Sequence, residues 1–257
     1  MEKQTFSEKL KAGKFVITSE IGPPKGTNIE PHLKEAEHIR DKIDAFNVTD
    51  LQSSVMRLGS LATCRLLIER GMEPVFQITC RDRNRLALQS DLLSAYVLGV
   101  RNVLCLTGDH TTLGDHPDAK PVFDLDAVSL LKVATDLMNG KDMKGNDLDG
   151  KPEFFPGAVV SPGYEPVELQ IIKMEKKIEA GAKFFQTQAV YDLNSFEKFM
   201  KMVEKYNVPI LGGIVLLKSA GMAKYMNEKV AGVSVPDRYI NMMAQAKKEE
   251  RVKVSVQ

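Results

Sequence analysis

The segment 102–110 reads Asn-Val-Leu-Cys-Leu-Thr-Gly-Asp-His and is the strongest indication of the fold. Residues 103–106 are apolar at consecutive positions, a pattern typical of a β-strand that is buried on both faces. Strands of this kind form parallel sheets that helices cover. A glycine, an acid and a histidine follow directly, where parallel α/β proteins carry their functional groups.

Six further β-rich runs recur along the chain, and segments with helical periodicity separate them. They are Phe15–Ser19, Ala45–Thr49, Pro74–Thr79, Gly157–Ser161, Lys183–Gln188 and Pro209–Val215. Their spacing of about 26 to 30 residues is that of strand–helix units, apart from one gap of about 55 residues. Several predicted helices end in glycine just before the next strand, as at Gly71, Gly99 and Gly181, which favours a repeated return from helix to sheet.

The choice lies between an open doubly wound sheet and a closed barrel. After the first β-rich run the chain reads Ile21-Gly-Pro-Pro-Lys-Gly26, and its prolines cannot supply the backbone donors of a dinucleotide-binding turn. We therefore predict an α/β fold of the TIM-type (β/α)₈ barrel class. The length of 257 residues suits a single barrel domain over residues 1–257.

Composition narrows the possible partners. Lysine and arginine number 35 against 34 acidic residues, and a net charge of +1 without a basic run disfavours nucleic-acid binding. The sequence predicts no membrane span and no signal peptide, so we expect a cytoplasmic protein. The scattered Cys64, Cys80 and Cys105 fit buried, reduced thiols better than a disulfide framework or a metal site.

Two acids end predicted strands. Glu20 follows the first strand, and it suits either a general acid with a raised pKa or a cap of a backbone turn. Asp109 follows Gly108, whose missing side chain permits the close approach of a flat ligand, and the acid could balance a developing positive charge. His110 and His116 lie in the same loop, and we expect them to be solvated rather than metal ligands.

Two neutral or basic side chains follow later strands. Gln188 offers both a donor and an acceptor, which suits the edge of a heterocycle, although a glutamine in a polar barrel layer would look the same. Lys218 lies after the seventh strand, where it could form a Schiff base in an aldolase-type barrel or simply be exposed.

Taken together, these residues resemble the methylenetetrahydrofolate reductase family, flavin-dependent barrels of one-carbon metabolism. The matching motifs are short, appear in family order and span most of the chain. They are Ser19-Glu20-x-x-Pro23-Pro24, Ile78-Thr79-Cys80, Leu106-Thr107-Gly108-Asp109, Ala180-Gly-Ala182 and Thr187-Gln188.

The resemblance implies a reaction and roles for individual residues. Reduced flavin, FAD or FMN, would deliver hydride to 5,10-methylenetetrahydrofolate and give 5-methyltetrahydrofolate, in a reaction that could be reversible. Glu20 would be the general acid that opens the five-membered ring, Asp109 would stabilise the cation near flavin and pterin, and Gln188 would hydrogen-bond the folate. The positions at which the family contacts the flavin are Thr49, Gln77, Thr107, Gly108, Asp109, Gln170 and Lys177.

Departures from the family pattern bear on the electron donor. Ile21-Gly22 replaces two aromatic residues, Thr107 replaces an arginine, and Ala220 replaces the aromatic residue that would stack on folate or nicotinamide. The donor is thus NAD(P)H or, as in similar short members from anaerobes, a partner subunit with metal centres. We therefore expect an oligomer or a subunit of a complex. The other interpretations are the Lys218 aldolase and a non-catalytic pterin-binding subunit of a methyl-transfer complex.

The eighth strand of the barrel is the open point. By spacing, Val230–Val235 could be that strand, whereas the resemblance places it in the connection after the seventh helix. On the second interpretation, we expect the final strand–helix unit to be missing from this chain.

Overall fold

The computed structural model describes residues 4–230 and 232–256. Within them seven strands form one sheet in chain order, and each pairing recorded is parallel. The strands are β1 (Thr18–Ile21), β2 (Ala45–Val48), β3 (Pro74–Thr79), β4 (Asn102–Leu106), β5 (Phe155–Val160), β6 (Phe184–Ala189) and β7 (Ile210–Gly213). This order confirms the predicted α/β class, a TIM-type barrel without an eighth strand among the described residues.

One helix precedes the first strand, others connect successive strands, and the last helices follow the seventh strand. They are α1 (Phe6–Lys11), α2 (Glu30–Ile39), α3 (Ser60–Glu69), α4 (Arg85–Val97), α5 (Ala127–Met138), α6 (Val167–Glu179), α7 (Leu193–Val203), α8 (Ala220–Lys229), α9 (Asp237–Gln245) and α10 (Arg251–Val256). The chain divides into two compact units, residues 1–158 with 177–183, and residues 159–176 with 184–257. The single domain over 1–257 stays a prediction.

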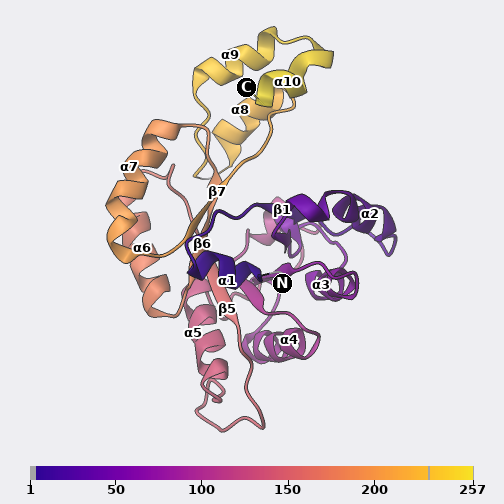
Figure 1. Ribbon diagram of the computed structural model, residues 1–257, viewed down its shortest axis with the longest axis vertical. Coiled ribbons are helices and arrows are strands. Elements are labelled where there is room, and N and C mark those ends of the chain that lie inside the picture. Colours follow the sequence, from indigo (N-terminus) through magenta and orange to yellow (C-terminus); the bar gives the residue numbers. More distant parts are fainter. Residues whose placement is uncertain (1–3, 231, 257) are drawn as a thin grey trace. The chain divides into compact units, whose positions relative to one another are not determined.

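The strands of the first unit have two unlike faces. Alternate residues of a strand point to opposite faces, and the register places Phe46, Phe76 and Val103 on one of them, all at most 2% exposed. Helices α3 and α5 pack on β3 and β4, and α2, α3 and α4 lie side by side along this unit (Figure 1). The apolar face provides the core that these helices need. The opposite face carries polar residues.

The N-terminal helix, which the sequence did not predict, is fixed to the first unit. Thr5 and Glu8 form a reciprocal capping box. Phe6 is fully buried, its backbone N–H donates to Glu73 (2.9 Å), and its ring meets Phe155 edge-on at 6.3 Å. Because Glu73 immediately precedes β3 and Phe155 begins β5, α1 lies at the amino ends of these strands, opposite the predicted site.

Most predicted strand positions agree with the structure, and the first is shifted. The expected run Phe15–Ser19 is replaced by Thr18–Ile21. Phe15 is 89% exposed, and the backbone N–H of Ile17 donates to the side chain of Asp44 (2.8 Å) rather than to a sheet partner. The apolar residues at 15 and 17 therefore suggested a strand three residues too early.

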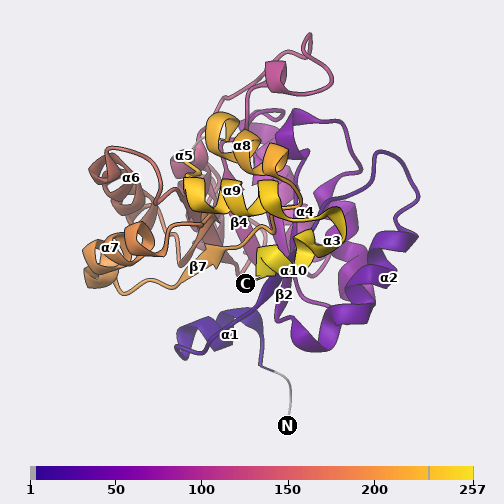
Figure 2. The ribbon, with the colours of Figure 1, turned by 90° about the horizontal axis from the view of Figure 1, so that it is seen from above.

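The second unit contains a separate small core. Helices α8, α9 and α10 lie together (Figure 2) around a cluster that includes Leu217, Ala223 and Met243. Val233 and Val235 belong to this cluster, and residues 232–235 form no strand. Apart from Ala231, which lies outside the described residues, the segment Val230–Val235 is thus the connection from α8 to α9. The interpretation from spacing, an eighth strand there, is wrong.

Candidate active site

The polar face of the first unit carries the predicted site residues toward the carboxyl ends of the strands. The register sets Glu20 beside Asn47, and Asn47 beside Val75. Since alternate residues share a face, Thr49 and Gln77 lie on the same face, one step further along their strands. Glu20, Thr49 and Gln77 are thus brought to one edge, as the barrel prediction requires.

Glu20 is the acid on this edge whose properties suit a general acid. Its side chain is exposed, and Oε1 accepts a hydrogen bond from Nε2 of Gln52 at 3.1 Å. Although the residue is exposed, the surrounding protein removes part of the hydration of the Glu20 carboxyl group, and this raises its pKa. The hydrogen bond from Gln52 lowers the pKa by a smaller amount. A carboxyl group with a raised pKa holds its proton closer to neutral pH, which is what a general acid needs.

Thr49 offers an unused polar group next to Glu20. The residue is 2% exposed, and its Oγ1 is buried without a hydrogen-bond partner. A Cβ at Gly22 would lie 3.7 Å from this Oγ1 and 3.7 Å from Oε1 of Gln52. Because residue 22 is a glycine, no side chain at this position packs against the two oxygens. An unpaired buried hydroxyl is costly unless a ligand satisfies it.

A buried acid, Asp50, holds the strand ends together. Its carboxylate accepts hydrogen bonds from the Thr79 backbone N–H (2.9 Å), Thr79 Oγ1 (2.9 Å) and Ser60 Oγ (3.3 Å). Arg83 adds a two-pronged ion pair, Nη1 at 2.8 Å and Nη2 at 3.2 Å. Burial lowers the pKa of the Arg83 guanidinium, but Asp50 and other acids more than offset this and raise it. Asp50 is therefore a structural acid.

A second buried charge, Arg81, connects the loops that follow β2 and β4. The residue is 2% exposed; its Nη2 donates to the carbonyl of Leu51 and its Nη1 to the carbonyl of Asp109, both at 3.2 Å. Gly108 makes this possible, since it has φ of +93° and a Cβ there would lie 3.1 Å from Cβ of Arg81. The backbone of Asp109 is thus fixed while its side chain stays exposed.

Other residues of the loop that follows β4 make contacts that hold the loop in place. Thr107 Oγ1 accepts from the backbone N–H of Ala127 at 3.2 Å, at the start of α5. His110 accepts from the Thr112 N–H, and His116 pairs with Asp115 at 2.9 Å. Among the described residues, no group of three histidine, cysteine or acidic side chains could hold a metal ion.

The other predicted contacts divide between the two units. Lys177 belongs to the first unit, and its charge is one of the effects that lower the pKa of Asp126, against the larger opposing effect of burial. Gln170, on α6, and Gln188, on β6, belong to the second unit and are half-buried. The carbonyl of Gln188 accepts from Thr187 Oγ1 at 2.7 Å. Lys218 is exposed, in the loop between β7 and α8.

Sequence reasoning missed the roles of four residues at this edge. Asp50, Arg81 and Arg83 lie within four residues of the ends of buried strands, and charged residues at such positions are a usable signal that they pair below the surface. The sequence gives no sign of the role of Gln52, because its contact joins the loop after β2 to Glu20 in β1, 32 positions away.

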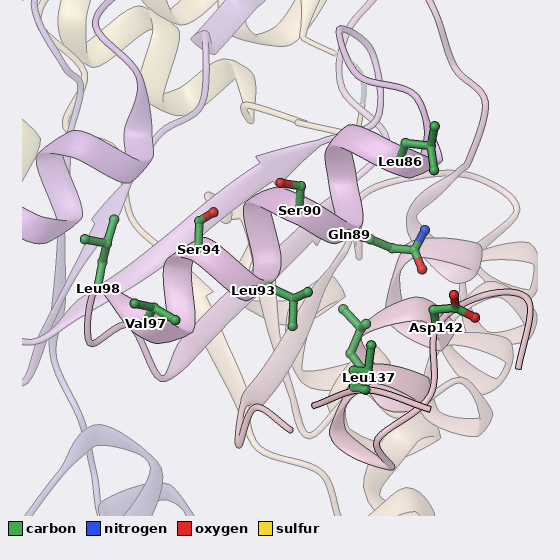
Figure 3. A pocket seen from close by; sticks show the side chains of 10 residues that line it. Leu86, Gln89, Ser90, Leu93, Ser94, Val97, Leu98, Leu137 and Asp142 are labelled. Atoms are coloured by element: carbon green, nitrogen blue, oxygen red, sulfur yellow. The ribbon is translucent and has the colours of Figure 1, made fainter. Parts of the chain in front are cut away.

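A groove of about 670 Å³ lies elsewhere in the first unit. Residues of α4, among them Leu86, Leu93 and Val97, line the groove together with Leu137 and Asp142 (Figure 3). Gln89 in its wall is already engaged, because its Oε1 accepts from the Met143 N–H at 2.9 Å. The groove lies on the helices rather than at the strand ends, so we do not place the chemistry there.

The three cysteines are free and buried, as predicted. Burial raises the pKa of Cys80 to about 12 and that of Cys64 and Cys105 further still. Thiols of this kind are poor nucleophiles at neutral pH. They serve as small core residues.

Comparison with known proteins identifies the family. Residues 5–257 match the family described as methylenetetrahydrofolate reductase. The chain belongs to this family. Methylenetetrahydrofolate reductase 2 of Schizosaccharomyces pombe is 28% identical over 95% of this chain, and 5,10-methylenetetrahydrofolate reductase of Pectobacterium carotovorum subsp. carotovorum is 26% identical over 73%. The chain spans 39% and 58% of the length of these relatives.

A solved structure has a similar fold. It is an uncharacterized protein from Clostridium thermocellum that binds two copies of 5-methyl-5,6,7,8-tetrahydrofolic acid. The TM-score is 0.66 at 17% identity, over 96% of this chain and 83% of the other. At this identity the likeness concerns the fold alone. In the part of the chain that the structure describes, no helix has the length and apolarity of a membrane span.

Proposed function

We propose that this chain reduces 5,10-methylenetetrahydrofolate to 5-methyltetrahydrofolate with a bound flavin, and that Glu20 is the general acid. The observation that carries the proposal is that one polar edge of the sheet holds both the Glu20 carboxyl group, whose pKa is raised, and the Thr49 hydroxyl, which has no hydrogen-bond partner. Membership of the reductase family supports the substrate class. The reaction could run in both directions.

In this proposal Glu20 donates a proton to a nitrogen of the five-membered ring of the substrate. The bond from that nitrogen to the methylene carbon breaks, and its electron pair stays on the nitrogen. The other nitrogen and the methylene carbon then form an iminium cation. The carboxylate of Asp109, whose backbone Arg81 holds, stabilises this cation. Gln188 binds the pterin edge through its amide.

The residues of the first unit fit a flat, polar cofactor such as FAD or FMN. The Thr49 hydroxyl lacks a partner, Gln77 brings a buried amide, and Gly108 brings a backbone of positive φ directly after β4. We propose that these residues and Thr107, Asp109, Gln170 and Lys177 hold the flavin. When bound, the flavin supplies the hydride for the methylene carbon; the protein orients it and supplies charge.

The electron donor in this proposal is NAD(P)H or a partner subunit with metal centres. Ala220 stands where an aromatic side chain would stack on nicotinamide, and it packs against the core of the second unit. A methyl group cannot stack on a ring in this way. This favours the partner subunit.

Purification without denaturation, followed by identification of the released flavin, tests the proposal first. We expect FAD or FMN bound in a fixed ratio and folate-dependent reoxidation of the reduced protein. Protein that is colourless and gains no flavin absorption band on incubation with either flavin contradicts it. Borohydride trapping with carbonyl substrates tests the Schiff-base aldolase: Lys218 is exposed, whereas such a lysine needs a desolvated site, so we expect no adduct.

A further inference from the structure

The loop after β2 has an unusual backbone. Leu51, Ser53 and Ser54 have φ of 45°, 56° and 59°, the left-handed region that residues other than glycine seldom adopt. Three such residues within four positions persist only where the surroundings fix them, and strain of this kind is concentrated at functional sites.

Contacts from the neighbouring loops fix this segment. Arg81 donates to the carbonyl of Leu51 at 3.2 Å. Gly114 packs so closely that a Cβ there would lie 1.7 Å from the carbonyl oxygen of Ser54. Asp115 Oδ1 accepts from the backbone N–H of Met56 at 3.0 Å.

The same segment is tied to the loop that follows Glu20. Arg57 Nη1 donates to the carbonyl of Pro23 at 3.1 Å, and the backbone N–H of Leu58 donates to the carbonyl of Pro24 at 2.8 Å. The loops after β1, β2 and β4 therefore form one connected structure, and Gln52 lies where it reaches Glu20.

We propose that Gln52 is the positioning residue of Glu20 and that it fixes which carboxyl oxygen carries the acidic proton. Nε2 of an amide can only donate, so Glu20 Oε1, which it contacts at 3.1 Å, must accept. When Glu20 is protonated, its proton then lies on Oε2, the oxygen left to face the substrate. This inference rests on the proposed function for the role of that proton, but the contact itself can be tested without turnover.

The charged side chains of the surrounding loops are engaged with other partners and do not take the place of Gln52 as the hydrogen-bond donor to Glu20. Lys25 and His116 both pair with Asp115, and Arg57 is engaged with the carbonyl of Pro23. Gln52 is the side chain of the described residues whose hydrogen bond lowers the pKa of Glu20, against the larger effect of lost solvation. The ionisation of Glu20 should therefore respond to the chemistry at position 52.

The test is a titration of Glu20 in the full-length protein by carbon NMR of ¹³C-labelled glutamate, with the signal assigned through Glu20→Gln. We expect Gln52→Leu, which removes the donor, to move the titration to higher pH. Gln52→Lys, which brings a positive charge, should move it to lower pH. Met56→Ala is the matched control, since that side chain is 51% exposed in the same loop and should leave the titration unchanged.

Opposite shifts in the two variants cannot come from a loosened loop, because loosening would move both titrations in the same direction. In turnover, we expect Gln52→Leu to lower kcat by about tenfold and to move the alkaline limb of the kcat profile to higher pH. An unchanged titration in both variants overturns the inference. Opposite shifts in a protein that never reduces folate would contradict the proposed function and leave the Gln52–Glu20 contact established.

Discussion

Asp50 and Glu20 are two acids at the carboxyl ends of neighbouring strands, and their surroundings differ sharply. Asp50 is 3% exposed and accepts five hydrogen bonds, from Thr79, Ser60 and Arg83. Glu20 is exposed and accepts one, from Gln52. A carboxyl group whose oxygens are occupied by several donors links parts of the fold, whereas one with a raised pKa and a free oxygen can give up a proton. Environment, not residue type, separates the scaffold from the chemistry.

The largest effect is expected where the scaffold acid is removed. Asp50→Ala removes the acceptor of the buried Thr79 N–H and of two Arg83 nitrogens, and Arg83 keeps its pair with Asp91. We expect the free energy of unfolding to fall by about 3–5 kcal/mol, as when one member of a buried ion pair is deleted. Urea unfolding followed by circular dichroism measures this.

The control for that prediction is an ion pair at the surface of the same unit. Lys132 pairs with Asp136 on α5 and is 62% exposed. Lys132→Ala should change the free energy of unfolding by less than about 0.5 kcal/mol. Equal losses in the two variants would show that Asp50 is not the structural acid described.

An intermediate effect is expected where the scaffold meets the reactive acid. Gly114→Ala places a Cβ against the carbonyl of Ser54, so the 51–54 loop must move and carry Gln52 away from Glu20. We expect stability to fall by about 1–3 kcal/mol and folate reduction to fall by more than the folded fraction explains. Gly26→Ala, where a Cβ meets nothing within 4 Å, is the control. A Gly114→Ala variant with normal turnover would refute the link between these loops.

The sequence predicts the scaffold better than the site. Alternation of apolar runs with helical periodicity is local, so the predicted bounds of β3 agree with the observed ones. A helix cap is also a local signal: Asp126 directly precedes the apolar stretch of α5 and accepts from the Ser129 N–H at 2.8 Å. Glu20 and Asp109 were found because they end apolar strands. The contacts that set the properties of these acids join segments far apart in the chain, and hydrophobic periodicity does not reveal such contacts.

Other misses have local physical reasons. In the sequence, Asn194 with Glu197 three residues later has the spacing of a capping box, but the helix at 193–203 begins directly after Asp192, whose side chain accepts from the Asn194 N–H. Both residues are good caps, and the earlier one takes the position. Helix α1 was missed because six residues give too short a pattern, and its place depends on Glu73 and Phe155 far along the chain.

The smallest expected effect is the contribution of Glu20 to the pH dependence of the free energy of unfolding. Because folding raises the pKa of Glu20, the folded state binds more protons than the unfolded state between the ordinary glutamate pKa and the raised one. Wild-type stability therefore falls as the pH rises through this window. Glu20→Gln lacks this effect, so its stability relative to wild type should rise with pH. Unfolding in urea at a series of pH values measures it.

Glu8 gives the control of opposite sign. Hydrogen bonds with Thr5 lower the pKa of Glu8, so its contribution to stability is present above the unfolded pKa and is lost as the pH falls. Glu8→Gln should lose stability relative to wild type as the pH rises. Parallel trends in the two variants would contradict the assignment of a raised pKa to Glu20.

The most direct measurement of the central claim is the rate at which reduced flavoprotein is reoxidised by methylenetetrahydrofolate, compared between wild type and Glu20→Gln in a stopped-flow experiment. We expect a loss of at least about 100-fold in the variant, with flavin content, folate binding and flavin reduction preserved. Reoxidation at the wild-type rate in Glu20→Gln would contradict the role of Glu20 as the general acid.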